Sequence, residues 1–240
     1  MTDAHPSALC ATSSRALYHQ VASLLLYQGV FDHPIGTEFL TLLRYLHHND
    51  TSQQPEAAAC LQAYGSWFRC LAASGQSWQD FLWQRLLQDD NPFSQWVQQQ
   101  PLDTVPSSLK AAAMHDLNLL QMVYNCPTAQ ILQWVTIASQ TSGSPTAWQM
   151  PNQVPMPIAP EQWWGDQLGF FADHYHRQGA GLFGQYDAFR WQQDQLQPVS
   201  HPDGITLANL VGYDGPKTSL CQNTECLLQG LPALNVLLYG

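Results

Sequence analysis

The sequence predicts a mainly α-helical protein, in which an irregular helical N-terminal domain precedes a short helix–strand unit at the C-terminal end. Three observations support this prediction. Apolar residues recur at three- and four-residue spacing over most of the chain, which is the period of an amphipathic helix. Residues that start helices and residues that end them separate these stretches at short intervals. Little of the chain before residue 234 has the pattern of a strand.

The first 75 residues contain three predicted helices. The first begins near Ser13 and ends at Gly29, the second spans about 37–48, and the third opens near Ser52 and ends near Gly75. Their spacing implies helices that each bury one face against the others. The side chains expected in the core are Leu17, Val21, Leu24, Leu25, Phe39, Leu42, Leu43, Leu46, Cys60, Leu61, Tyr64, Phe68 and Leu71.

Clear start signals mark the next two helices. Ser77 stands three residues before Asp80, which is a variant of the capping box, and an apolar helical stretch follows. Asn91 and Pro92 then begin a short helix that continues through Trp96.

Two more helices are predicted over about 107–124 and 128–135, and a loop separates them from the last helix of the domain. Residues 141–160 change in composition to Ser, Gly, Pro, Gln and Met, which indicates an irregular loop. Pro160 and Glu161 open the last helix. Its expected inward residues are Trp164, Leu168, Phe171 and Tyr175.

The tail of the chain has a distinct organisation. We expect the helical domain to cover 1–191, a polar linker to cover 192–204, and a separate unit to begin at residue 205. Val211, Gly212, Tyr213 and Asp214 predict a tight turn, in which Gly212 is free to take a positive φ and Asp214 caps the next helix.

The helix after this turn is expected to end at Gly230 and Pro232. Leu234–Tyr239 is an apolar run typical of a strand buried on both faces. Such a strand needs parallel neighbours, and the preceding sequence supplies almost none. We therefore expect the sheet to lie beyond residue 240, in a longer protein of which this chain is the front part.

Composition and charge limit the possible partners. The chain has 8 basic and 18 acidic residues and a formal net charge of -10, which argues against a nucleic acid or an anionic membrane as partner. The N-terminus has no signal-peptide pattern. The six cysteines show no framework spacing, so we expect a reducing, cytoplasmic environment.

Several motifs of the tail match one known family. They are Leu210–Tyr213, Asn223–Glu225, Pro232-Ala233 and Asn235–Gly240. This stretch resembles the start of a bacterial family of AAA-type P-loop ATPases whose biological role is uncharacterised, and residues 181–191 are similar to the family's lead-in. The family has Glu where this chain has Asp214, and Asn where it has Leu234.

The resemblance implies that residues 205–240 are the first helix and strand of an α/β P-loop module, which is incomplete here. In AAA-type proteins the Val211-Gly212-Tyr213 turn lies against adenine, and Gly240 is the first glycine of the phosphate loop, so these four residues are the candidate nucleotide contacts. The Lys and the Ser or Thr of Gly-x-x-x-x-Gly-Lys-Ser/Thr are absent from the 240 residues. ATP and magnesium are thus implied for a complete parent. The chain itself is expected to have no catalytic residue and to bind nucleotide weakly at most.

Other clusters have plainer explanations. Asp173, His174 and His176 include metal-binding residue types, but positions 174 and 176 point about 200° apart on a helix. Cys221 and Cys226 lie on neighbouring helix faces without a second pair, so we expect no metal site. The aromatic residues Trp163, Trp164, Phe170 and Phe171 are interpreted as core.

We therefore expect the N-terminal region of an ATP-binding AAA-type ATPase, in which the helical domain recognises a protein partner or regulates the ATPase. An oligomeric parent is left open. The alternative is a free-standing all-α protein-interaction module without a nucleotide site. The presence or absence of a phosphate loop in the coding sequence after codon 240 distinguishes the two.

Overall fold

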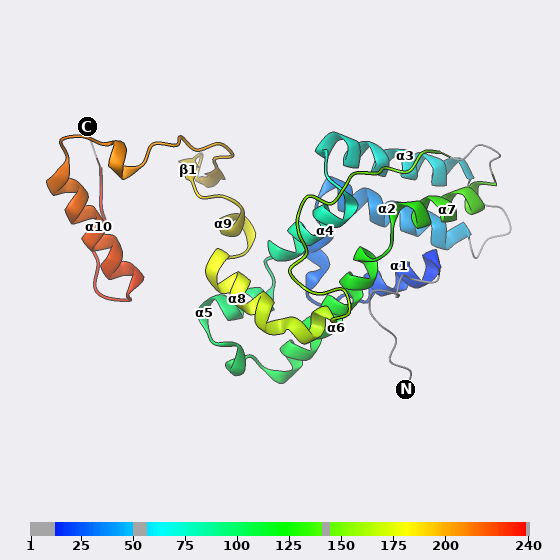
Figure 1. Ribbon diagram of the computed structural model, residues 1–240, viewed down its shortest axis with the longest axis horizontal. Coiled ribbons are helices and arrows are strands. Elements are labelled where there is room, and N and C mark those ends of the chain that lie inside the picture. Colours follow the sequence, from blue (N-terminus) through cyan, green and yellow to red (C-terminus); the bar gives the residue numbers. More distant parts are fainter. Residues whose placement is uncertain (1–12, 50–56, 141–144, 239–240) are drawn as a thin grey trace. The chain divides into compact units, whose positions relative to one another are not determined.

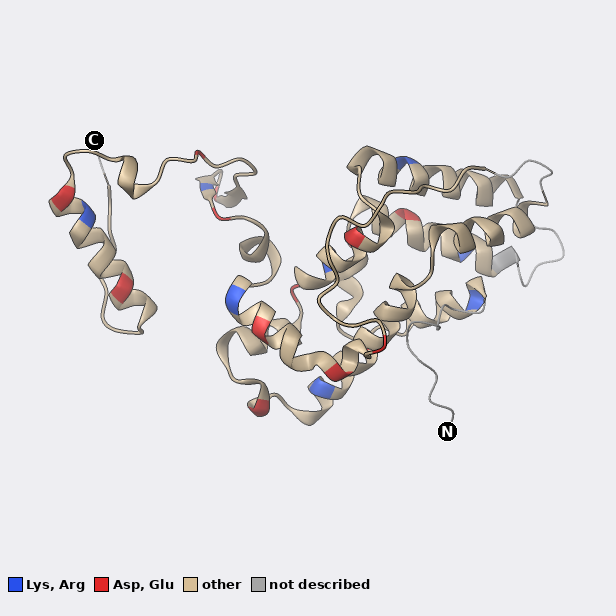
Figure 2. Cartoon of the chain, viewed as in Figure 1, with Lys and Arg blue, Asp and Glu red and all other residues tan. Residues whose placement is uncertain are grey.

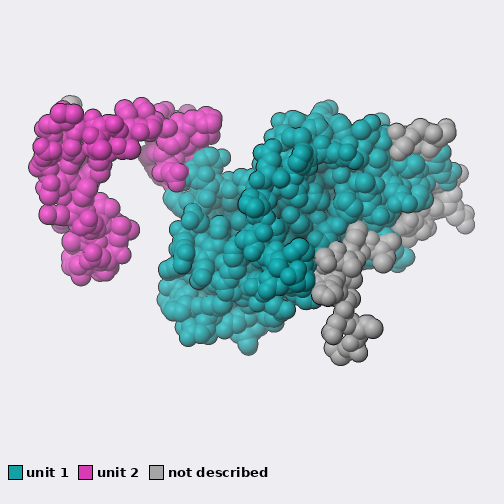
Figure 3. All heavy atoms as spheres, in the orientation of Figure 1, with its two compact units in different colours: residues 1–186 teal, residues 187–240 magenta. Residues whose placement is uncertain are grey.

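The computed structural model describes residues 13–49, 57–140 and 145–238. It divides the chain into two compact units, residues 1–186 and 187–240 (Figure 3). The protein is mainly α-helical, as predicted, and within the described residues its sheet consists of two antiparallel strands (Figure 1). None of the described helices is long and apolar enough to cross a lipid bilayer.

The first unit consists of nine α-helices and three 3₁₀ helices among the described residues. They are α1 (Ser14–Ala22), η2 (Tyr27–Phe31), α2 (Pro34–Asn49), α3 (Ala57–Ser74), α4 (Trp78–Leu87), α5 (Pro92–Gln99), η3 (Leu102–Thr104), α6 (Ser107–Tyr124), α7 (Thr128–Ser139), η4 (Trp164–Gln167), α8 (Leu168–Gln178) and α9 (Gly181–Gln185).

These helices pack in two neighbouring groups around one continuous core. Helices α2, α3 and α7 lie side by side, and α1 packs on α2 (Figure 1). Helix α8 packs along α5, and η4 lies against α6. Phe39 and Trp67 of the first group and Trp78, the first residue of α4, are almost completely buried, with the Phe39 and Trp78 rings 4.3 Å apart between centroids. Trp83, on α4, packs against the second group. Its ring centroid lies 5.2 Å from that of Trp164 and 5.9 Å from that of Phe171.

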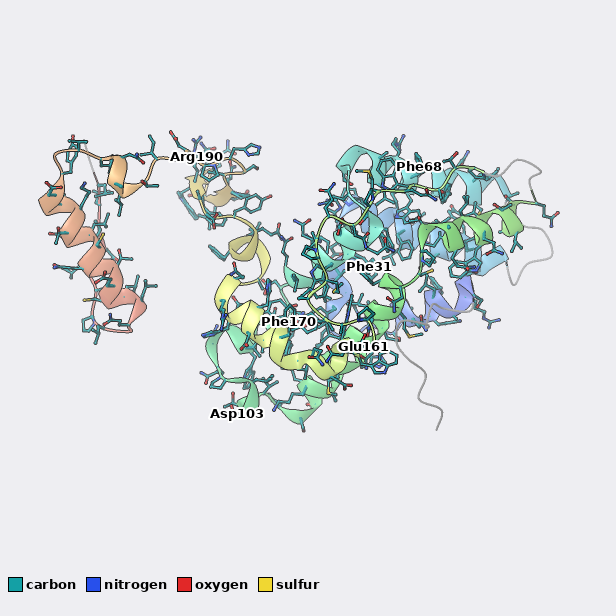
Figure 4. All side chains as sticks on the ribbon, viewed as in Figure 1. Phe31, Phe68, Asp103, Glu161, Phe170 and Arg190 are labelled. Atoms are coloured by element: carbon teal, nitrogen blue, oxygen red, sulfur yellow. The ribbon has the colours of Figure 1, made fainter. Side chains whose placement is uncertain are left out.

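Most of the predicted core is therefore confirmed, and the aromatic interpretation is confirmed for Trp164, Phe170 and Phe171. Trp164 and Phe171 are buried, and Trp163 and Phe170 are half-buried. The side-chain view shows Phe31 and Phe170 among the packed helices (Figure 4). Trp67, which is fully buried on α3, was missing from the predicted core.

A buried carboxylate explains why the first helix is shorter than predicted. Helix α1 ends at Ala22, not at Gly29, and Leu25 is 61% exposed. The side chain of Asp116, on α6, accepts hydrogen bonds from the backbone N–H groups of Leu25, Leu26 and Tyr27 at 2.7–3.0 Å. Because these N–H groups bond to Asp116, they do not form the backbone bonds that would continue α1, and η2 begins at Tyr27.

A second buried carboxylate holds the long loop. Ser77 accepts from the N–H of Asp80 at 2.9 Å and so caps α4 as predicted. The Asp80 carboxylate does not complete a capping box. It accepts instead from the N–H groups of Gln153 and Val154 at 2.8 and 3.1 Å, which fixes the irregular chain after residue 145 on α4.

The two-stranded sheet was not predicted. Strands β1 (Phe189–Gln192) and β2 (Gln195–Pro198) form a hairpin, which overlaps the start of the predicted polar linker, 192–204. Gln193 and Asp194 form its two-residue turn, with φ of 51° and 58°. Such turns usually contain Asn-Gly or Asp-Gly, so Gln-Asp carries little signal. The strand residues are mostly exposed and polar, so the sequence shows no alternation of buried and exposed positions there.

Candidate functional site

The turn that was predicted to contact adenine lies directly before α10 (Asp214–Leu228) in the second unit. Gly212 has the predicted positive φ, 86°, and a side chain added there would meet nothing within 4 Å. Val211 is 87% exposed and Tyr213 is 60% exposed. The turn therefore presents one aliphatic and one aromatic side chain to solvent on either side of an open glycine.

A lysine of α10 bonds to the backbone that precedes this turn. The Lys217 ammonium donates hydrogen bonds to the backbone carbonyls of Leu207 and Leu210, the former on η5 (Leu207–Asn209). It also lies 3.6 Å from the carboxylate of Asp214. Asp214 is the first residue of the helix and not its cap, because Tyr213 occupies the cap position without a side-chain bond. Sequence reasoning had not assigned a role to Lys217.

The far end of α10 has the expected glycine stop. Gly230 has φ of 71°, its N–H donates to the Leu227 carbonyl, and the N–H of Leu231 donates to the Cys226 carbonyl at 2.8 Å. These two bonds form a Schellman motif, which reverses the chain after the helix.

The chain then runs back along α10 but forms no strand in its described part. The predicted strand Leu234–Tyr239 is thus wrong for residues 234–238, and Tyr239 and Gly240 lie outside the described residues. The Asn223 side chain forms hydrogen bonds with the backbone of Leu234, as a neighbouring strand would have done. Its amide donates to the Leu234 carbonyl and its oxygen accepts from the Leu234 N–H, both at 2.8 Å. One side chain therefore satisfies both backbone groups of one residue.

The second unit has no buried side chain among its described residues, 187–238. Most of its apolar residues are instead exposed, at fractions of 81% for Leu228, 82% for Leu234 and 83% for Leu237. Burial of a leucine side chain is worth about 1.5–3 kcal/mol. A surface of this kind is typical of a segment that packs against further chain or a partner. The other exposed large apolar residues of this unit are Trp191, Leu196, Ile205, Leu207, Leu210, Val211, Tyr213, Leu227, Leu231, Val236 and Leu238.

This part of the chain matches a protein family. The family described as protein of unknown function (DUF815) matches residues 184–240. No curated protein and no solved structure matches the chain. The match begins just before the hairpin and includes the turn, α10 and the segment held by Asn223.

The remaining candidate clusters lie apart from this match. On α8, Asp173 and His176 are exposed, whereas His174 is half-buried and Tyr175 is fully buried. Burial lowers the pKa of His174, against the opposing effect of a backbone hydrogen bond at Leu87. Among the described residues no three His, Cys, Asp or Glu side chains are grouped as metal ligands would be.

Sequence reasoning missed a buried polar network where α4, α5 and α8 meet. Tyr175 donates to the Leu86 carbonyl at 2.7 Å, and its hydroxyl lies 3.4 Å from that of Tyr27. Asn91 donates to the Asp89 carboxylate at 2.7 Å. Burial raises the pKa of Asp89 to about 6, and burial also raises the pKa values of both tyrosines above their ordinary range. These groups are satisfied within the fold, so the network is structural.

Charged side chains are sparse on both units (Figure 2). The ion pair of Lys217 with Asp214 is the one found among the described residues. The site around the turn therefore contains a positive group that is already engaged by the exposed carboxylate of Asp214, and its exposed apolar side chains are Val211 and Tyr213.

Proposed function

We propose that residues 205–240 are the leading part of an AAA-type nucleotide-binding module and that the helical first unit recognises a protein partner or regulates that module. The observation that carries the proposal is that the second unit buries none of its described side chains and exposes most of its apolar ones. The first unit buries its apolar residues in a continuous core. By contrast, α10 and the segment after it contain no buried residue in their described part. A helix and an extended apolar segment of this kind suit one edge of a larger α/β layer.

The residues of the turn fit an adenine ring. An aromatic ring at Tyr213 and an aliphatic side chain at Val211 can pack on its faces, and Gly212 leaves room for close approach. In this proposal Lys217 keeps the turn in shape by holding the carbonyls of Leu207 and Leu210. ATP with magnesium would be the cofactor of a complete module, and its phosphate chemistry would come from residues other than those described.

The coding sequence gives the most direct test. We expect the reading frame to continue after Gly240 with two residues followed by Gly-x-Gly-Lys-Ser or Gly-x-Gly-Lys-Thr. A verified gene without this motif in any frame would remove the ATPase assignment and leave the all-α interaction module.

Nucleotide binding tests the role of the turn. In the protein encoded by the whole reading frame, Tyr213→Ala should weaken ADP binding by roughly 5- to 150-fold, because stacking of an aromatic side chain on a base is worth about 1–3 kcal/mol. Trp191→Ala is the matched control, since Trp191 is a similarly exposed aromatic residue on the hairpin. Calorimetry that shows equal affinity for the two variants would exclude Tyr213 from the site.

A further inference from the structure

A pocket of about 510 Å³ lies between the end of α5 and the face of α8. Gln99 and Gln100 lie on one side of it, and Gly169, Ala172, Asp173 and His176 lie on the other. Its volume is within the range of pockets that hold small ligands or single side chains of a partner. The pocket belongs entirely to the first unit and is separate from the Val211–Tyr213 turn along the chain.

The sequence of α8 creates this pocket. Residues 169, 172, 173 and 176 share one helix face, because they are spaced by three and four positions. Gly169 and Ala172 provide almost no side chain, and a side chain added at Gly169 would meet nothing within 4 Å. Ala172 is buried and lines the pocket. The two small residues therefore leave a hollow, which the exposed residues Asp173 and His176 also line.

The charge distribution around the pocket favours a cation. Asp173 is exposed and has no ion pair in the part of the chain that the structure describes. Helix α5 ends at Gln99, so the negative end of its dipole and its last carbonyl groups lie at the opposite border. The side-chain oxygens of Gln99 and Gln100 are further acceptors. Arg177, the next residue after His176, does not line the pocket.

We propose that this pocket binds a cationic side chain, lysine or arginine, of a partner protein. The inference rests on the proposed role of the helical unit in partner recognition and names the chemistry that would be recognised. The ammonium or guanidinium group would lie between Asp173 and the end of α5, and the apolar part of the side chain would lie over Gly169 and Ala172. The acidic net charge of the chain, -10, favours the approach of a basic partner.

Titration of the full ¹⁵N-labelled chain with short peptides tests the proposal. Acetyl-Gly-Lys-Gly-amide and acetyl-Gly-Arg-Gly-amide should produce saturable shifts of the Gly169 backbone amide and of the Gln99 and Gln100 side-chain amides. Acetyl-Gly-Gln-Gly-amide and acetyl-Gly-Glu-Gly-amide should not. Equal shifts with the neutral peptide, or no saturation with the basic ones, would overturn the proposal.

Two variants separate the pocket from general electrostatics. Asp173→Asn should weaken binding of the lysine peptide by about two- to fivefold, as expected for one exposed charge pair. Asp166→Asn removes an exposed carboxylate from the 3₁₀ helix just before α8 and should leave binding unchanged. Both side chains are exposed, so thermal melting should be the same for the three proteins. An Asp173→Asn variant that binds as the parent does would contradict the assignment.

Free n-butylammonium distinguishes a side chain of a partner from a small organic cation. We expect it to bind more weakly than the lysine peptide, because it lacks the flanking backbone. Equal or tighter binding would overturn the assignment to a partner protein. The experiment involves no nucleotide, so its failure would leave the proposed nucleotide module untouched, and failure of ADP binding would leave this pocket untouched.

Discussion

At the scale of single residues, three buried aspartates determine much of the shape of the helical unit. Asp116 holds the start of η2, Asp80 holds the loop after residue 145, and Asp89 pairs with Asn91 at the start of α5. Asp116 and Asp80 each join segments that are distant in the sequence and that a helical period alone cannot relate. A carboxylate with several N–H donors is stabilising where it is buried, because each bond to the charged group is worth about 1.5–3 kcal/mol.

Asp89 should make stability depend on pH in an unusual direction. Burial raises its pKa to about 6, against the lowering effects of the Asn91 hydrogen bond and of the charge on Arg85, and Asp90 and Asp32 raise it further. A carboxyl group with a raised pKa in the folded state contributes stability that is complete below its unfolded pKa, near 4. That contribution is lost as the pH rises through about 6.

The variant Asp89→Asn should therefore gain stability relative to the parent between pH 4.5 and 7.5, by on the order of 1–3 kcal/mol. The amide oxygen can still accept from Asn91, so the substitution keeps that contact. Urea unfolding of both proteins at the two pH values gives the difference. A stability difference that stays constant over this range would contradict the raised pKa.

One of these aspartates could have been found from the sequence. Ala113, Asp116, Leu117 and Leu120 share one helical face, so a carboxylate stands within an apolar stripe and must be buried with partners. Its partners could not be predicted, because residues 25–27 lie about 90 positions away in the chain. The turn between Val211 and Tyr213 was predictable from Gly212 alone. The role of Lys217 was not, because it depends on how close α10 lies to the carbonyls of Leu207 and Leu210.

At the scale of elements, helical period and start signals located most helices, and their failures have physical causes. Ser13, Ser77 and Asn91 cap α1, α4 and α5 as predicted. The hairpin was missed because its turn lacks glycine. The strand at Leu234 was predicted from composition, but strand formation needs a neighbouring backbone, and Asn223 is the one partner that the structure shows.

Asn223 should determine how firmly the segment after α10 is held. In Asn223→Ala both bonds to Leu234 are lost, and the Leu234 amide should exchange its hydrogen roughly tenfold or more faster, since each bond contributes about 0.5–1.5 kcal/mol. Gln222→Ala, at an adjacent exposed position of the same helix, is the control. Hydrogen exchange followed by NMR reports on this single amide. An exchange rate at Leu234 that does not differ between the two variants would mean that the clamp is not formed in solution.

At the scale of the whole molecule, the contrast between the two units is the main feature. The first unit has a continuous core, and the second has no buried side chain among its described residues. The sequence predicted a helical domain followed by a separate tail, but the boundary between them remains a prediction. Neither periodicity nor composition could show that the tail lacks a core of its own, because burial depends on what surrounds each helix.

Removal of the tail should therefore leave the helical unit intact. A chain that ends at Gly204 should melt within about 2 °C of the full chain and should aggregate less, because the exposed leucines of α10 and of the segment after it are gone. Thermal melting followed by circular dichroism compares the two. A melting temperature lower by about 10 °C, which corresponds to roughly 3–5 kcal/mol at this size, would show that the tail contributes to the core.

The bonds between Asn223 and Leu234 also bear on how copies of the chain behave toward one another in concentrated solution. An extended apolar segment with free N–H and carbonyl groups can template pairing with the same segment of another molecule. At Leu234, the first residue of the apolar run 234–239, both groups are already occupied from within the chain. A neighbouring copy would have to displace the Asn223 side chain before its backbone could pair with Leu234. Asn223 therefore acts against self-association at this position.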